Sequence, residues 1–247
     1  LNEVICVIEA SRFFDDIREE DYFAVDGTAP TLYVAQALRM IQHIEHASAL
    51  LLTEWTDLDT RDLSILLAAL SHLAPGARIR LDGSAADAPP TSWSELAHQP
   101  GWVHVLNSEH EPHMTDIRVS SFRYEQIRPF HPGRLHRLLE AQLGNGAFGA
   151  VIRSAGFCRL ATRPGILGSW EHVGQMISLE PLTRDDSAGR NFLSLGQEIA
   201  FIGIDLDHVA LEVALDAATL TDSELEAGPR TWSRFADPFP QWVTSDA

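Results

Sequence analysis

The sequence predicts an α/β fold in two parts, a parallel α/β domain followed by a small α+β domain. Residues 4–8 and 49–52 are continuous apolar runs of strand length, which is the pattern of strands covered on both faces. After each run, apolar residues recur three or four positions apart, as in amphipathic helices. Strands that alternate with helices favour a parallel sheet.

The first domain is predicted to span residues 1–106. Its expected elements are strands at 4–8, 49–52 and 77–81 and helices at 31–47 and 61–73. Thr60 can cap the second of these helices. Residues 82–90 are rich in Asp, Ala, Gly and Pro, which is typical of a surface loop, and Ser92 with Glu95 fits a capping box of a short helix.

Residues 107–116 are predicted to be a linker, and residues 117–247 a second domain. Its expected elements are strands at 119–127, 151–161, 170–182 and 198–204 and helices starting at 132 and 207. Pro132 suits the first position of its helix, and His131 before it can act as the cap. The order β-α-β-β-β-α predicts a small sheet with helices on one face.

The net charge of −17 is unevenly spread, and arginines cluster in residues 118–163. An acidic chain repels nucleic acid overall, so only local docking of this Arg-rich segment is compatible with it. Arg128, Arg134, Arg153 and Arg159 are the candidate contacts for a partner. The simpler interpretation is that these arginines form ion pairs and solvated faces within the chain.

Several classes of protein are excluded by composition. No apolar run is long enough to span a bilayer, and no basic-then-apolar leader opens the chain, so we expect a cytoplasmic protein without membrane contact. Cys6 and Cys158 form no recognisable disulfide or metal spacing. No Ser/His/Asp or Cys/His arrangement indicates a nucleophilic catalytic site. The chain starts at Leu1 inside a strand-like run, which favours part of a longer polypeptide.

Four short sequence motifs, in a fixed order, indicate a protein family. They are Arg-Pro-Phe-His-Pro-Gly-Arg-Leu at 128–135, Gly-Gln-Glu-Ile-Ala-Phe-Ile-Gly at 196–203, Leu-Asp at 206–207 and Asp-Pro-Phe-Pro-Gln-Trp at 237–242. Together they resemble the C-terminal domain of the CobW family, P-loop GTPases linked to zinc, cobalt and nickel. The first part resembles the back half of that GTPase domain. The resemblance implies GTP as the family's nucleotide and a GTPase domain or protein client as the partner of Arg128 and Arg134.

The family's nucleotide-binding motifs are absent or altered in this chain. It contains no lysine, and a phosphate-binding loop needs one on the β- and γ-phosphates. The base-reading motif Asn-Lys-x-Asp is replaced by Thr-Glu-Trp-Thr-Asp at 53–57, which leaves only Asp57 as a candidate nucleotide contact. We therefore expect no GTPase activity from this chain. The family's Cys-x-Cys-Cys metal motif has no counterpart either.

A His-rich segment is the candidate metal site. His104, His110 and His113 lie close in sequence, with Glu109 and Asp116 nearby, and imidazole with carboxylate suits Zn²⁺. By resemblance, family members often carry a His-rich loop at this place. The other interpretation is a solvated linker, because the spacing across Pro112 matches neither a helical His pair nor a zinc finger.

Two functions follow from these observations. The first is part of a CobW-like metallochaperone of zinc, cobalt or nickel homeostasis, which acts through protein interaction because this chain lacks a phosphate-binding loop. The alternative is a GTPase-degenerate interaction factor that binds a large partner, such as the ribosome under zinc limitation, through its Arg-rich sheet.

Overall fold

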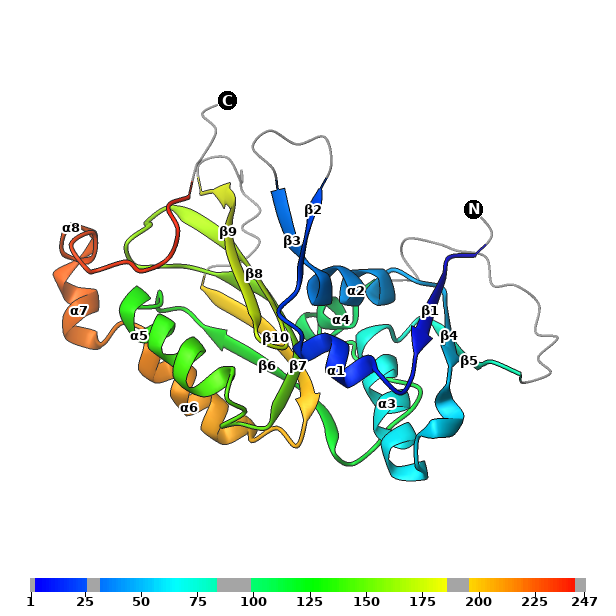
Figure 1. Ribbon diagram of the computed structural model, residues 1–247. Coiled ribbons are helices and arrows are strands. Elements are labelled where there is room, and N and C mark those ends of the chain that lie inside the picture. The colour runs from blue at the N-terminus through cyan, green and yellow to red at the C-terminus, as the bar shows by residue number, and fades with distance from the viewer. Residues whose placement is uncertain (1–2, 26–31, 84–98, 186–195, 243–247) are drawn as a thin grey trace.

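The computed structural model describes residues 3–25, 32–83, 99–185 and 196–242, and its two main sheets differ in type (Figure 1). A three-stranded parallel sheet has the order β1-β4-β5. Its strands are β1 (Ile5–Glu9), β4 (Ala49–Thr53) and β5 (Arg78–Leu81). A five-stranded antiparallel sheet has the order β6-β10-β7-β8-β9. Its strands are β6 (Val119–Gln126), β7 (Ala150–Cys158), β8 (Ile166–Val173), β9 (Met176–Arg184) and β10 (Gln197–Ile204). The predicted fold class is confirmed.

Two helices connect the parallel strands, as the sequence predicts. They are α2 (Gln36–Glu45), between β1 and β4, and α3 (Thr60–Leu73), between β4 and β5. The cap of α3 is Asp59 rather than Thr60, because the Asp59 carboxylate accepts a hydrogen bond from the Asp62 amide. Both helices contribute to the same core as Ile8 and Leu50, so they cover one face of the small sheet.

The predicted start of the first helix is wrong. Residues 32–35 form β3 (Leu32–Ala35), which pairs antiparallel with β2 (Tyr22–Val25) in a separate two-stranded sheet. A short apolar run satisfies strand and helix periods equally, and Tyr33 with Val34 favours the strand. Helix α1 (Phe13–Arg18) was also missed, because six residues are too few for a clear helical period.

The second part contains one more strand than expected. Residues 170–182 were predicted as one strand, but they span the β8–β9 hairpin, which turns at Gly174 with φ of 57°. The remaining elements are α5 (Pro132–Leu138), the π-helical turn η2 (Leu139–Leu143), α6 (His208–Ala218), α7 (Asp222–Ala227) and α8 (Pro229–Trp232). Pro132 begins α5 and the His131 imidazole caps it by accepting from the amides of Gly133 and Arg134, as predicted.

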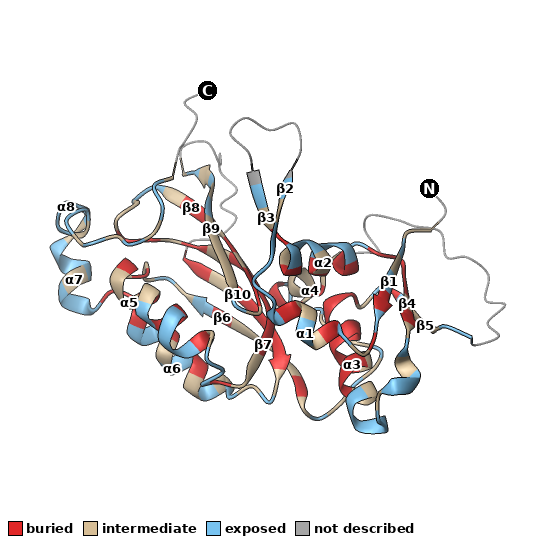
Figure 2. Ribbon diagram, in the orientation of Figure 1, coloured by how far each residue is buried: buried red, intermediate tan, exposed pale blue. Residues whose placement is uncertain are grey.

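Helices cover both faces of the antiparallel sheet (Figure 1). Helices α5 and α6 pack on one face over Ile199 and Phe201, which confirms that the helices of the second part share a face. The opposite face carries Ala200 and Ile202 and packs against α3 and α4 (Gly101–Leu106) from the first part. Figure 2 shows that burial concentrates along these layers, whereas α7 and α8 are exposed.

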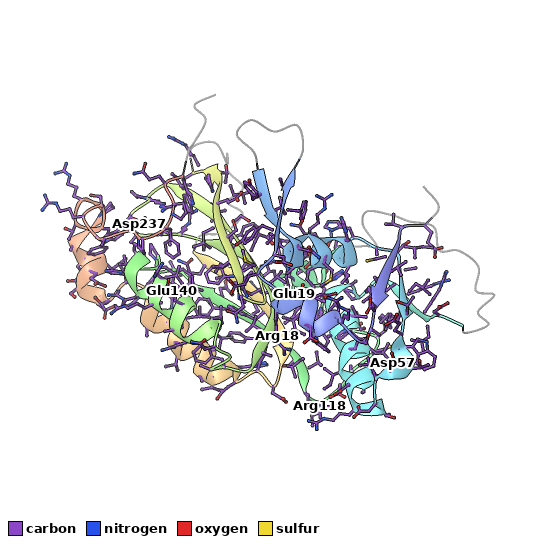
Figure 3. The ribbon with its side chains drawn as sticks, viewed as in Figure 1. Arg18, Glu19, Asp57, Arg118, Glu140 and Asp237 are labelled. Atoms are coloured by element: carbon purple, nitrogen blue, oxygen red, sulfur yellow. The ribbon has the colours of Figure 1, made fainter. Side chains whose placement is uncertain are left out.

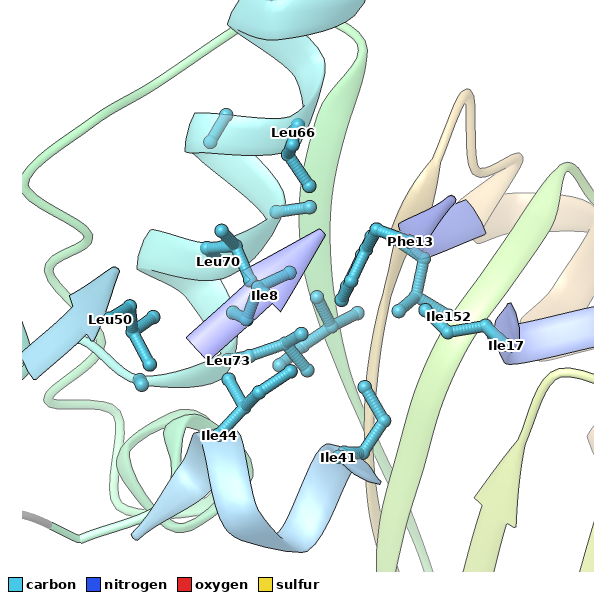
Figure 4. Packing of buried hydrophobic residues seen from close by; sticks show 14 of the residues in the cluster. Ile8, Phe13, Ile17, Ile41, Ile44, Leu50, Leu66, Leu70, Leu73 and Ile152 are labelled. Carbon is cyan, nitrogen blue, oxygen red and sulfur yellow. The ribbon is translucent and has the colours of Figure 1, made fainter. Parts of the chain in front are cut away.

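The two sheets share one apolar core although no strand pairs between them in the described residues. Ile152 of β7 lies in the same cluster as Ile41, Ile44 and Leu70 of the first part (Figure 4). The helices α2 and α3 therefore lie between the small parallel sheet and the large antiparallel one. The division into domains at 1–106 and 117–247 stays a prediction, and Ser92 and Glu95 lie outside the described residues.

Candidate functional site

The loop after α4 folds back onto the end of α3 and brings histidines together. The His110 Nε2 lies 2.9 Å from His72 Nδ1, and the two rings are 4.9 Å apart between centroids. The His113 Nδ1 lies 3.0 Å from the Ser71 hydroxyl, which also accepts from the Met114 amide. The structure thus adds His72, which belongs to α3, to the histidines that the sequence singles out.

The His72–His110 pair is uncharged at neutral pH. Burial lowers the pKa of His72 to about 4. Burial, together with the nearby His72 and His104, lowers the pKa of His110 to about 4. One neutral ring must therefore donate its N–H to the other ring. The His110 Nδ1 is buried and has no hydrogen-bond partner among the described residues. Neutral imidazole is the form of histidine that binds a metal ion.

The described residues contain no group of three or more His, Cys, Asp or Glu side chains that could hold a metal ion. The Asp116 carboxylate is held by hydrogen bonds away from the histidines. It accepts from Arg118 Nε at 2.8 Å and from the Ser64 hydroxyl at 2.7 Å. These bonds, chiefly those from Arg118, hold the pKa of Asp116 well below its usual range. A metal site of His104, His110 and His113 stays a prediction.

Asp57 lies at the carboxyl end of the parallel sheet, where α/β folds bind ligands. It ends the short 3₁₀ helix η1 (Trp55–Asp57) directly after β4, and its side chain is exposed. Figure 3 shows it at the edge of the molecule, far from Asp237. Glu54 before it adopts a left-handed backbone with φ of 51°, and the Trp55 indole donates to the Asp82 carbonyl at 3.1 Å. The Trp55–Asp82 hydrogen bond connects the loop to the end of β5, and a nucleotide contact at Asp57 stays a prediction.

The four candidate interaction arginines all form ion pairs within the chain. Their partners are Asp222 for Arg128, Glu224 for Arg134, Glu45 and Glu171 for Arg153, and Asp185 for Arg159. The exposed fraction of the side chain decides what each can touch: it is 40% for Arg128 and 1% for Arg153. Contact with a partner stays a prediction, and Arg153 is too buried to make one directly.

Arg153 is the centre of a buried polar cluster. Its Nε donates to Glu45 at 2.8 Å and its Nη2 lies 2.6 Å from Glu171. Burial raises the pKa of Glu45, and Arg153 opposes that rise. Burial alone would lower the pKa of Arg153, but the two carboxylates outweigh it and raise the pKa. Close by, Ser154 accepts from the Trp170 indole at 2.8 Å.

The C-terminal strip, residues 237–242, packs onto the antiparallel sheet, and its alternating proline and aromatic residues favour an extended backbone. Phe239 and Trp242 contact the core beneath α5 and α6. The Trp242 indole donates to the Leu179 carbonyl at 2.7 Å, and the Arg163 guanidinium lies 4.3 Å from the centre of its ring. Asp237 anchors the start of the strip by pairing with Arg163 at 3.0 Å.

No helix within the described residues is long and apolar enough to cross a membrane.

These features define the class of the protein: an antiparallel sheet backed by helices, joined through a common core to a three-stranded parallel α/β unit. Residues 119–219 match the sequence profile of the cobalamin synthesis protein cobW C-terminal domain. Within this chain, residues 119–219 are therefore similar to the CobW C-terminal domain.

Curated relatives align with nearly the whole chain. The zinc-regulated GTPase metalloprotein activator 1 of Dictyostelium discoideum is 24% identical over 96% of this chain and 56% of its own length. A zinc chaperone of Mycobacterium tuberculosis is 26% identical over 97% of this chain and 61% of its own length. The chain thus spans little more than half the length of these relatives. Among solved structures, the Zn(II)-bound YjiA GTPase from E. coli matches over 89% of this chain and 62% of its own, with 16% identity and a TM-score of 0.38.

Proposed function

We propose that this chain is part of a zinc metallochaperone of the CobW type and that it acts by contact with a protein client. The observation that carries the proposal is the alignment of almost the whole chain, CobW C-terminal domain included, with relatives named for zinc delivery and metalloprotein activation. The shared core supports treating the two parts as one working unit. Zinc is then the cargo and GTP the nucleotide of the complete protein, and we place the protein in the cytoplasm.

Within this chain, the His72–His110 pair is our candidate for a zinc contact. The two nitrogens that face each other are 2.9 Å apart, the rings are uncharged at neutral pH, and the pKa of His110 is lowered partly by the nearby His104. Zinc usually takes four ligands, so two or three imidazoles would leave positions open for water or a client group. An incomplete ligand set suits a site that releases its metal.

The test is a zinc titration of the full chain against a chromophoric chelator. We expect binding that weakens at least tenfold in the His110→Ala/His113→Ala variant and in His72→Ala. The matched control is His43→Ala/His46→Ala, which removes two imidazoles from exposed positions on and after α2. Equal zinc affinity in all variants, or no binding in any, would refute zinc binding at this loop.

A further inference from the structure

Helix α6 is apolar on its outer side as well as on the side that faces the sheet. Its eleven residues include only three polar side chains, those of His208, Glu212 and Asp216. Leu211 and Leu215 are buried in the core of the antiparallel sheet. On the outer side, Val209 and Val213 are 73% and 64% exposed, and Figure 2 shows exposed stretches along α6. A helix that is apolar all round is normally covered on both sides, but α6 is covered on only one.

The exposed apolar residues form one ridge along the helix. Val209, Val213 and Ala217 are spaced four residues apart, so they lie above one another on the same side of α6. Ala217 is exposed like the two valines. We call these three residues the outer ridge of α6. Ridges of residues four apart are the surfaces that pack into the grooves of a neighbouring helix, so the outer ridge fits a second helix.

Carboxylates run beside the outer ridge. Glu212 and Asp216 are also four residues apart and form a parallel row next to it. Asp216 accepts from the Tyr124 hydroxyl at 2.9 Å and from the Gln126 amide at 3.0 Å, which are both neutral. Neither carboxylate has a cationic partner among the described residues, and residues 205–217 contain no Lys or Arg. A helix that docks here therefore gains from Lys or Arg beside its own apolar residues.

We propose that the outer ridge of α6 binds an amphipathic helix of a partner protein, with Lys or Arg flanking its apolar stripe. A second copy of this chain fits poorly, because it would bring the same carboxylates against Glu212 and Asp216 in a chain of net charge −17. Anionic lipids and nucleic acids meet the same repulsion. The proposal names a surface for the client contact of the proposed function and rests on that contact, but it requires no zinc.

The test uses the full chain, with a chelator present to remove zinc, and fluorescently labelled peptides read by anisotropy. Each peptide is about 18 residues long, or five helical turns. The first has a Leu stripe at helical spacing flanked by Lys, and the second has the same stripe flanked by Glu. The third has the composition of the first with the Leu positions scrambled. We expect the first to bind and the other two to bind at least tenfold more weakly.

Two variants alter the surface in different ways. Val209→Gln/Val213→Gln keeps good helix formers at exposed positions but removes the apolar contact, so it should weaken binding of the first peptide at least tenfold. Glu212→Arg keeps the outer ridge and reverses one charge, so it should weaken the Lys peptide and strengthen the Glu peptide. The matched control is Leu182→Gln, which replaces a residue that is 47% exposed on β9, at the opposite edge of the sheet from β6. It should bind as the unaltered chain does.

Thermal melting of each variant separates loss of the surface from loss of the fold, and Glu212→Arg keeps the test decisive if the double variant melts early. Absence of binding, equal binding of the three peptides, or unchanged binding by Val209→Gln/Val213→Gln would overturn the proposal. A dimer of the chain that this double variant dissociates, seen by sedimentation velocity, would also overturn it in favour of a second copy. Because zinc is absent throughout, failure here leaves the zinc titration unaffected and is distinct from failure of the proposed zinc function.

Discussion

Glu45 and Arg153 form an ion pair that joins the two halves of the chain across 108 residues of sequence. Glu45 ends α2 in the parallel part and Arg153 lies in β7 of the antiparallel sheet, with 2.8 Å between Oε1 and Nε. The side chains are 2% and 1% exposed. A pair so deeply buried holds its partners in one geometry, because either charge alone would be costly in the interior.

Arg153→Met should therefore destabilise the chain strongly. The substitution leaves Glu45 without its cation and should lower the free energy of unfolding by about 3–5 kcal/mol. The Glu45→Leu/Arg153→Met double variant removes both charges, so it should be clearly more stable than the single variant. Urea denaturation followed by circular dichroism measures the difference.

Arg123→Met is the matched control for this prediction. Arg123 pairs with Glu198 at 2.8 Å, but its side chain is 31% exposed. Its loss should cost about 0–1 kcal/mol, the range of surface pairs. Similar losses in Arg123→Met and Arg153→Met would show that the buried pair does not hold the halves together.

The sequence predicts the strands and connecting helices of the parallel sheet because the strands are continuous apolar runs and the helices are regular. The prediction that these strands are covered on both faces is wrong for β1, where Ile5 and Val7 are exposed. Prediction from sequence also fails at residues 32–35 and at the β8–β9 hairpin, where short segments satisfy more than one period and pairing across the sheet decides the outcome. The position of Arg153 in the sequence also indicates a buried ion pair. A charged residue between Ile152 and Ala155, inside an apolar strand, implies a buried partner, although sequence cannot say that the partner is Glu45.

The candidate metal site could likewise be predicted only in part from the sequence. The cluster of histidines at 104–113 is visible in the sequence, but the contact of His110 with His72 spans 38 residues and depends on how the loop returns to α3. Nothing in the local spacing marks His72, which occupies a buried position in a helix. Likewise, the ion pairs of Arg128 and Arg134 are made with Asp222 and Glu224 of α7, which is distant in sequence.

The stability of the chain should rise with pH between about 4 and 6.5. His72 and His110 have pKa values lowered from 6.5 to about 4, so in this window the folded state binds fewer protons than the unfolded state. Their contribution is complete above pH 6.5 and is lost as the pH falls toward 4. In the His72→Gln/His110→Gln variant the slope of unfolding free energy against pH should be shallower.

His172 remains in that double variant, and burial lowers its pKa to about 4 as well, so the slope should decrease without vanishing. Urea denaturation at half-unit steps of pH gives both slopes. An unchanged slope in the double variant would mean that the two imidazoles are not desolvated as the structure indicates.

Gly174→Ala should be more destabilising than Gly165→Ala, although both glycines have positive φ, 57° and 76°. At Gly165 an added Cβ meets nothing within 4 Å, so only the backbone penalty of about 1–2 kcal/mol applies. At Gly174 the Cβ would lie 2.1 Å from the Ile17 carbonyl oxygen, which belongs to α1. Overpacking adds about 1–3 kcal/mol. Thermal melting measures the midpoint of unfolding for each variant. Equal midpoints would contradict the close contact between the hairpin and α1.

GTP should neither bind tightly to this 247-residue chain nor be hydrolysed by it. The chain has no lysine for the phosphates, and the loop after β4 presents Glu54 where the base-reading motif of the family carries a cation. Isothermal calorimetry and phosphate release test the prediction directly, and Asp57→Ala provides the comparison for the one remaining candidate contact. We expect identical traces for both proteins. Micromolar binding that Asp57→Ala abolishes would show that this exposed loop still reads guanine, and that the residues lost from the motif are dispensable.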